Sequence, residues 1–183
     1  MGGSGRAVQA ALEESTTRVL ATVLFTDIVD STATLERVGD AAWRNLLSTH
    51  KAGLRVHLNV HGGREVRTTG DGVLAVFDSP TRAVRCARDM ARSSRDGDVA
   101  IRVGVHTGEL EWIGDDVRGI AVHVAARVVA LGSRDEVMVS STTRELLEGS
   151  GLAFADAGTH ELKGLSGVRR VYRLSESAHA PAG

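Results

Sequence analysis

One twelve-residue run limits the possible fold more than any other part of the sequence. RVLATVLFTDIV, residues 18–29, is mostly apolar and rich in β-branched side chains. Such a run suits a central β-strand that is buried on both faces. With 183 residues, the chain is long enough for one domain with a sizeable core and too short for two comfortable ones. The run therefore predicts a single domain with this strand at its centre.

The composition indicates a globular domain and excludes several classes of protein. Hydrophobic residues make up 42% and charged residues 25% of the chain, with a net charge of −1. A charge so close to zero gives no reason to expect nucleic-acid or membrane-surface partners. The single cysteine, Cys86, excludes an intramolecular disulfide and a cysteine-based zinc site. No apolar run approaches the roughly 20 residues of a membrane span, and no signal peptide is evident, so we expect no membrane segment in this chain and a cytoplasmic location.

Strand-like and helix-like segments alternate along the rest of the chain. Asp30, Ser31 and Thr32 offer N-caps for one helix that continues to Leu54. Strands at 62–69 and 73–77 are expected to form a hairpin, because Asp-Gly between them is a favoured turn. The other expected elements are a helix from Pro80, a strand at 99–105, a helix at 119–131, a strand at 137–140, a helix at 142–147 and paired strands at 154–162 and 168–174.

The order of these elements favours an α+β fold. It predicts a ferredoxin-like or palm-like βαββαβ core with a mostly antiparallel sheet, helices packed on one face and a C-terminal strand extension. Residues 1–17 open with Gly-Gly-Ser-Gly and are expected to form a flexible tail or linker. Residues 175–183 are small and polar and are expected to form a flexible C-terminal tail. The folded domain is expected over 18–174.

Two aspartates stand out by their positions. Asp27 lies at the end of the apolar strand, where a charged side chain is costly unless a partner compensates it. Asp71 lies in the hairpin turn, where Asp-Gly needs no functional reason. Together, one aspartate at a strand end and another at a hairpin tip can converge on hard cations. Phosphoryl-transfer enzymes hold two magnesium ions about 4 Å apart in this way.

Four spaced segments carry a resemblance to a known family. They are FTDIVDST at 25–32, REVRTTGDGVLAVF at 64–77, IRVGVHTGE at 101–109 and GDDVRGIAVHVAAR at 114–127. In this order they resemble the motifs of the class III nucleotidyl (adenylate or guanylate) cyclase catalytic domain of the bacterial type. The resemblance extends from about residue 19 to residue 174, and the ordered set is far more specific than any one motif.

The resemblance implies a metal-dependent reaction on a nucleoside triphosphate. Asp27 and Asp71 match the family's two metal-binding aspartates, and the Ile28 carbonyl is a further expected ligand. Two divalent cations per site, Mg²⁺ or Mn²⁺, are implied: one lowers the pKa of the ribose 3′-hydroxyl and the other binds the triphosphate. Residues 30–32 would direct backbone N–H groups at phosphate oxygens from a helix start.

The resemblance also implies a homodimer with two composite sites. Arg102 is expected to contact the triphosphate from the same chain as the metal ligands. From the facing subunit, Arg127 would stabilise charge on the α-phosphoryl group in the transition state, and Lys163 would reach the terminal phosphates. His123, one helical turn before Arg127, stands where many family members have asparagine and could replace its ribose contact with one N–H donor.

Base recognition departs from the pattern of adenylate cyclases. Those members pair a lysine with an aspartate, and the matching positions here are Arg67 and Asp116. Asp116 can accept a hydrogen bond from the adenine amino group, whereas the planar fork of Arg67 differs in geometry from a lysine. Adenine is the leading base. Cytosine stays open because it also offers an amino group, and guanine is less favoured because its carbonyl and N1–H suit a different pair.

The sequence therefore predicts a cyclase that converts ATP to 3′,5′-cyclic AMP and pyrophosphate by two-metal-ion catalysis at a homodimer interface. The alternatives are a class III cyclase for CTP, UTP or GTP, and a silent cyclase-homology module that binds nucleotide or only dimerises. The presence of both metal aspartates disfavours the silent module. A diguanylate cyclase is set aside, because Arg64 stands where its GG[DE]EF hairpin needs an acid.

Overall fold

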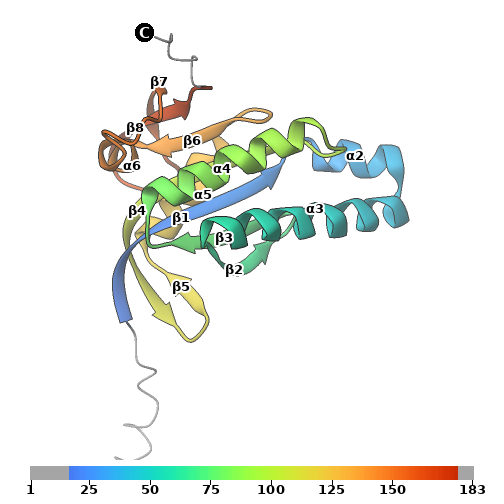
Figure 1. Ribbon diagram of the computed structural model, residues 1–183, viewed down its shortest axis with the longest axis horizontal. Helices are drawn as coiled ribbons and strands as arrows, with labels where there is room; N and C mark the ends of the chain where they lie inside the picture. Colours follow the sequence, from blue (N-terminus) through green and yellow to red (C-terminus); the bar gives the residue numbers. More distant parts are fainter. Residues whose placement is uncertain (1–16, 177–183) are drawn as a thin grey trace, which may run out of the picture.

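A single mixed sheet forms the centre of the structure, a computed structural model that describes residues 17–176. Its strand order is β2-β3-β1-β4-β6-β8-β7, with β5 paired to β4 (Figure 1). The strands are β1 (Thr17–Ile28), β2 (Arg64–Thr69), β3 (Gly72–Phe77), β4 (Ile101–Ile113), β5 (Asp116–Arg118), β6 (Val137–Ser140), β7 (Phe154–Glu161) and β8 (Val168–Leu174). The helices are α2 (Ser31–Val38), α3 (Asp40–His61), α4 (Pro80–Arg95), α5 (Ile120–Ala130) and α6 (Ser141–Leu146).

The predicted ferredoxin-like α+β core is confirmed. β1 lies between β3 and β4 and pairs antiparallel with both. In the sheet as described, only β4 and β6 pair in parallel. Every β1 residue from Ala21 to Thr26 is buried, as the apolar run predicts, but the strand begins at Thr17, one residue inside the predicted tail. Residues 1–16 and 177–183, the rest of both predicted tails, lie outside the described residues.

Helices cover both faces of the sheet, so the prediction of helices on one face is wrong. Leu24 and Phe77 pack with side chains of α3 and α4 in one core, and these two helices lie side by side over that face (Figure 1). Val23 and Phe25 point the other way and pack with side chains of α5. Successive residues of a strand alternate between its faces, so an apolar strand needs a packed layer on each. α5 supplies the second layer.

The long helix expected after β1 is two helices. Gly39 separates α2 from α3 with a φ of +81° and a ψ of 165°, outside the helical region. Its N–H donates to the carbonyl of Leu35 at 2.8 Å, which closes α2. Trp43 then packs into the core from the new helix. The apolar periodicity continued across the break, and glycine is the residue that adopts such a φ without strain.

The strand expected at 99–105 continues to Ile113 and turns back as β5. Gly114, with a φ of +60°, lies in the turn, and Ile113 then pairs with Asp116. The second half of β4 escaped prediction because its glutamates interrupt the apolar pattern. This extra hairpin carries Asp116, one of the predicted base-reading residues.

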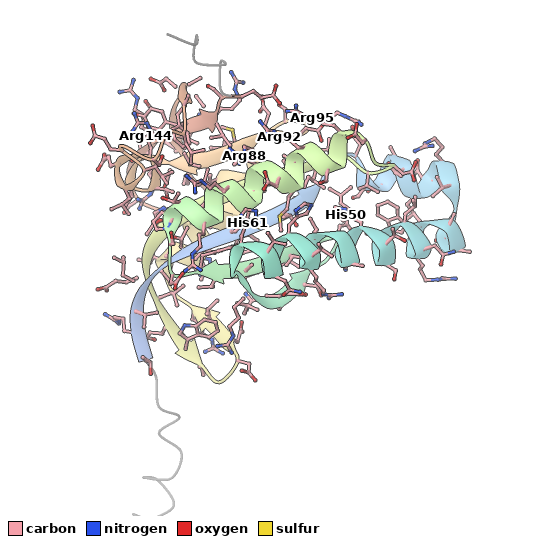
Figure 2. The ribbon with its side chains drawn as sticks, in the orientation of Figure 1. His50, His61, Arg88, Arg92, Arg95 and Arg144 are labelled. Carbon is pink, nitrogen blue, oxygen red and sulfur yellow. The ribbon has the colours of Figure 1, made fainter. Side chains whose placement is uncertain are left out.

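Polar contacts join α3 and α4, the two helices that cover one face of the sheet. Figure 2 shows His50 and His61 between α3 and α4, and His61 Nε2 lies 2.9 Å from Asp89 Oδ2. Burial lowers the pKa of His50, whose Nε2 is buried and has no hydrogen-bond partner among the described residues. Arg88, Arg92 and Arg95 follow the opposite edge of α4 (Figure 2). None of the helices between residues 17 and 176 is long and apolar enough to cross a membrane.

Gly104 allows α5 to approach the sheet closely. A Cβ atom at this position of β4 would lie 2.4 Å from the backbone nitrogen of Val129 and 2.6 Å from its Cα. Atoms do not tolerate such distances, so any other residue would force the helix and the strand apart. Gly53 of α3 differs, because a Cβ there would meet nothing within 4 Å.

A chain of buried hydroxyl groups crosses the core and ends at a histidine. Thr22 Oγ1 lies 2.9 Å from Thr107 Oγ1, which accepts from Thr143 Oγ1 at 3.2 Å. Thr143 contacts Ser140 Oγ, which lies 2.7 Å from His106 Nδ1. Burial lowers the pKa of His106 to about 4. The imidazole is therefore neutral at pH 7, because its burial disfavours the charged form.

The close approach at Gly104 predicts opposite effects for two alanine substitutions. Gly104→Ala should destabilise the fold by roughly 1–3 kcal/mol or more, because the methyl group overlaps the backbone of α5. The matched control, Gly53→Ala, should stabilise it by about 0.5–1 kcal/mol, because alanine is the better helix former. Urea denaturation measures both free energies of unfolding. Equal effects of the two substitutions would contradict the packing described for α5.

The buried histidine predicts a loss of stability in mild acid. The pKa of His106 is lower in the folded chain, about 4, than its ordinary value of 6.5. As the pH falls, the His106 imidazole is therefore protonated first in the unfolded state. The stabilisation present above pH 6.5 is lost as the pH falls towards 4. The free energy of unfolding decreases by at most about 1.4 kcal/mol per pH unit. The free energy of unfolding, measured from pH 7.5 to 4.5, should depend less on pH in His106→Gln.

The control for this experiment is His123→Gln, which makes the same substitution at an exposed histidine. It should keep the pH dependence of the parent protein. If both variants match the parent slope, the buried imidazole is not its source.

Candidate active site

An arginine compensates the aspartate at the end of β1. Asp27 pairs with Arg102 in the register of β1 and β4. Arg102 donates from Nε and Nη2 to the same carboxylate oxygen of Asp27, Oδ2, at 2.9 and 2.6 Å. The two side chains are 29% (Arg102) and 37% (Asp27) exposed, so solvent screens the pair only in part. A charged side chain at the end of an apolar strand needs a compensating partner, and for Asp27 this partner is the guanidinium of Arg102.

Thr26 fastens the β2–β3 hairpin beside Asp27. The N–H of Val73 donates to Thr26 Oγ1 at 3.0 Å. A Cβ on Gly72 would lie only 1.8 Å from the carbonyl oxygen of Thr26, so the hairpin approaches the strand as closely as a glycine permits. The antiparallel register of β1 and β3, continued past its last pair, sets Gly72 across from Asp27. The turn residue Asp71 is therefore held next to the end of β1.

An open depression of about 510 Å³ begins at the end of β1. This volume is within the range of small-molecule sites. The depression unites the predicted residues of the first motif with Arg102, although Asp71 does not line it. Its lining consists of Asp27, Ile28, Asp30, Ser31, Thr32, Ala33, Glu36 and Arg102.

The first turn of α2 opens into this depression without a side-chain cap. Asp30 adopts the left-handed conformation, with a φ of 55° and a ψ of 38°. Its carbonyl accepts the first helical hydrogen bond, from the Thr34 N–H at 3.0 Å. Its side chain accepts no hydrogen bond from the helix, so the predicted capping role of Asp30 is wrong. The free N–H groups and the helix dipole favour an anion at this end.

The donors at the end of β1 fit a hard divalent cation by their chemistry. Asp27 carries a carboxylate and is followed by the backbone carbonyl of Ile28, both in the lining of the depression. Asp71 adds a second carboxylate from the turn of the neighbouring hairpin. Within residues 17–176, no group of three or more His, Cys, Asp or Glu side chains is placed to hold a metal ion. The described residues alone therefore build no closed metal cage. Mg²⁺ is commonly held by one or two carboxylates together with substrate phosphates and water, which matches this donor set.

The two predicted base-reading residues contact each other. Arg67 of β2 donates from Nη1 to Oδ1 of Asp116 at the start of β5. The same oxygen accepts from the N–H of Val117 at 2.9 Å. Among the described residues, no group donates to Oδ2 of Asp116, which leaves that oxygen as a free acceptor. A second ion pair, Arg64 with Asp115 at 2.8 Å, also ties β2 to the β4–β5 hairpin.

α5 exposes one narrow stripe that carries two predicted residues. Most of the helix is buried against the sheet and the neighbouring strands. Its exposed residues are Ile120, His123, Arg127 and Ala130. Arg127 donates from Nε to the backbone carbonyl of Lys163 at 3.1 Å. The structure therefore brings the predicted Arg127 and Lys163 together, with His123 one turn away on the same stripe.

Within one chain, the predicted residues form three groups and not one. The first surrounds Asp27, the second is the Arg67–Asp116 pair, and the third lies along the exposed stripe of α5. Among the described residues, no hydrogen bond or ion pair joins the predicted side chains of different groups. One residue touches both the first group and α5: Arg102 donates from Nη1 to the carbonyls of Ala130 at 3.1 Å and Gly132 at 3.4 Å.

Three residues of the site were not predicted from the sequence. Thr26 gave a signal, because a threonine buried inside an apolar strand needs a hydrogen-bond partner. Glu36 also gave one, since it lies one helical turn after Thr32 and shares its face. Lys51 of α3, whose Nζ donates to the Gly70 carbonyl in the hairpin turn at 3.1 Å, gave none.

Comparison with known proteins agrees with the four motifs. The model of the adenylate and guanylate cyclase catalytic domain matches residues 13–176. A protein of Rhizobium meliloti (strain 1021) named "Putative adenylate cyclase 3" is 35% identical over 177 residues, which is 92% of this chain and 30% of that protein. The chain thus spans less than a third of the length of this relative.

Two solved structures share the fold at lower sequence identity. The adenylyl cyclase CyaB from P. aeruginosa superimposes with a TM-score of 0.82 at 22% identity, over 90% of this chain and 97% of that one. The guanylate cyclase domain of RhGC from Catenaria anguillulae, in complex with GTP, gives 0.78 at 21% identity, over 87% and 98%. The matched range contains all four motifs and the three groups of residues described above. The chain therefore belongs to the family of adenylate and guanylate cyclase catalytic domains, the class III nucleotidyl cyclases.

Proposed function

We propose that this chain is an adenylate cyclase that converts ATP to 3′,5′-cyclic AMP and pyrophosphate as a homodimer with two composite sites. The observation that carries the proposal is the division of the predicted residues. The residues proposed to bind cations and phosphate lie around Asp27, while Arg127 and Lys163 lie in a separate group on an exposed surface. A two-fold dimer can place the first group of one protomer against the third group of its partner, twice.

The group around Asp27 would hold the metal ions and the triphosphate. Asp27, Asp71 and the Ile28 carbonyl are the proposed ligands of two divalent cations, Mg²⁺ or Mn²⁺. When bound, these cations supply the charge that lowers the pKa of the ribose 3′-hydroxyl and binds the phosphates. The uncapped N–H groups of residues 30–32 and the guanidinium of Arg102 are proposed to bind triphosphate oxygens.

The exposed stripe of α5 would act on the substrate of the partner subunit. Arg127 is proposed to stabilise negative charge on the α-phosphoryl group, and Lys163 to bind the terminal phosphates. His123 is proposed to orient the ribose through one N–H donor. Ile120, on the same stripe, is 66% exposed, and a second copy of the chain would cover it. Catalysis would come from positioning and electrostatics, without a covalent step on the protein.

Asp116 would select the base, with Arg67 as its support. Because Arg67 and the Val117 N–H both hold Oδ1, the carboxylate is fixed in orientation and Oδ2 is left to accept from the adenine amino group. Named cyclases similar to this chain include both adenylyl and guanylyl members, so GTP is a natural alternative substrate. CTP, UTP and GTP are therefore tested beside ATP.

Mixing two inactive variants should restore activity if the sites are composite. Asp71→Ala removes a proposed metal ligand and Arg127→Ala a transition-state contact, so each homodimer should lose at least about 100-fold in turnover. A heterodimer of the two contains one intact site and one doubly damaged site. After subunit exchange, the mixture should recover up to about a quarter of the parent activity, measured as cyclic AMP formed with Mg²⁺ or Mn²⁺.

Asp27→Ala mixed with Asp71→Ala serves as the control, because both changes damage the same half and no intact site can form. No recovery in the test mixture after verified exchange would show that the site lies within one chain. Recovery in the control would show that Asp27 and Asp71 do not belong to the same half of the site. A parent protein that releases no product from any nucleoside triphosphate would favour the silent module.

The proposed base contact predicts a change in the ranking of substrates. Asp116→Ala should lower kcat/KM for ATP by roughly 10-fold or more and for GTP by less, because the lost acceptor serves the adenine amino group. Arg67→Lys, the residue typical of adenylate cyclases, should raise kcat/KM for ATP. The measurement is kcat/KM for ATP, GTP, CTP and UTP in the parent and both variants. A parent that prefers CTP or UTP would instead identify a pyrimidine cyclase.

A further inference from the structure

We propose that Arg102 is a built-in counter-cation of the metal site, which occupies Asp27 when no divalent ion is bound and competes with that ion for the carboxylate. This role differs from the triphosphate contact proposed for Arg102 above, and it rests on the assignment of Asp27 as a metal ligand. Arg102 is then a positioning residue that sets how readily the site accepts a cation.

The hydrogen bonds of Arg102 use all three nitrogens of its guanidinium. Nε and Nη2 donate to Asp27 Oδ2, and Nη1 donates to the carbonyls of Ala130 and Gly132. These carbonyls lie at the C-terminal end of α5, where the helix dipole favours a positive charge. The guanidinium is therefore held between two sources of negative charge, a carboxylate and a helix end.

Competition follows from charge and from position. The contact with Arg102 runs through a single oxygen of Asp27 at 2.6 Å, and a cation bound to that carboxylate would bring two further positive charges beside the guanidinium. Neither side chain is more than 37% exposed, so solvent screens this repulsion incompletely. A divalent ion at Asp27 must therefore weaken or displace the arginine, and the cost lowers the affinity of the site.

The helix end gives the displaced guanidinium a place to remain. Nη1 can keep its contacts with the carbonyls of Ala130 and Gly132 while Nε and Nη2 leave Asp27. No titration and no movement of the backbone is required. The freed Nε and Nη2 would then be available to an anion in the same depression, which Arg102 also lines.

Mn²⁺ binding to the nucleotide-free protein tests the competition without reference to turnover. Electron paramagnetic resonance of free Mn²⁺ gives the dissociation constant. Arg102→Gln should bind Mn²⁺ roughly tenfold more tightly than the parent or better, as expected when a charge-assisted contact no longer competes. A matched control is Arg18→Gln, because Arg18 also spans β1 and β4, through Glu111, at the opposite end of the strand pair. It should bind Mn²⁺ like the parent.

A further variant shows whether the gain in Mn²⁺ affinity depends on Asp27, and activity measurements distinguish this inference from the proposed function. Adding Asp27→Asn to Arg102→Gln should abolish the gain. Unchanged or weaker Mn²⁺ binding by Arg102→Gln, or a gain that survives Asp27→Asn, overturns the competition. If the parent forms cyclic AMP but Arg102→Gln shows no gain, the proposed function stands and this inference fails. If Arg102→Gln binds Mn²⁺ more tightly but no nucleoside triphosphate is converted, this inference stands and the proposed function fails.

A measurement on the parent protein covers the case in which Arg102→Gln does not fold. The ¹⁵N resonance of Arg102 Nε–H, assigned by its absence in Arg102→Lys, reports the contact with Asp27. Mg²⁺ should shift this resonance in the nucleotide-free parent, with a midpoint that matches Mg²⁺ binding. A resonance that stays unchanged at saturating Mg²⁺ would show that the ion and Arg102 do not compete.

Discussion

Alternate side chains of β1 point to opposite faces of the sheet, and both sets are buried and mostly apolar. The strand is therefore stable only between two packed layers, which α3 and α4 supply on one face and α5 on the other. The same requirement sets β1 between β3 and β4, because its backbone groups need partners on both edges. The burial of one strand thus fixes the places of the hairpin, of β4 and of α5, which carry the candidate site.

The chemistry gathers where the apolar layers end. Asp27 is the first charged residue after the buried part of β1, and the pairing with β4 delivers Arg102 to it. Thr26, one residue earlier, is still buried, and its hydroxyl group accepts a hydrogen bond from Val73 in the hairpin that carries Asp71. Two neighbouring residues of one strand therefore have separate roles. Thr26 holds the hairpin that carries the carboxylate of Asp71, and Asp27 provides the other carboxylate.

Local patterns in the sequence were sufficient for much of this architecture. The apolar run predicted β1, Asp-Gly predicted the hairpin, and residues 137–140 and 168–174 predicted β6 and β8 with their observed bounds. Gly39 was missed because a helical periodicity continued across it, and β5 because exposed strand ends carry polar residues. Such errors arise where the structure depends on a single backbone angle or on solvent exposure, because the pattern of apolar side chains does not report either of them.

The sequence predicted residues for the candidate site but not their contacts. Motifs identified Arg67 and Asp116 as a pair, and the structure joins them. The partner of Arg102 could not be predicted, because Asp27 lies 75 residues away and only the register of β1 and β4 brings the two together. A capping role for Asp30 was wrong for a related reason: the residue type suits a cap, but the residue adopts a left-handed backbone and its side chain accepts no hydrogen bond from the helix.

The missing side chain at Gly104 has a mechanical consequence. The backbone of Val129 packs directly on Gly104, and α5 shares a core with β1, so we expect helix and sheet to move together. In the proposed dimer, the distance between Asp27 of one protomer and Arg127 of its partner then cannot be tuned by a shift inside either chain. We therefore expect a signal that opens or closes the site to turn one whole protomer against the other.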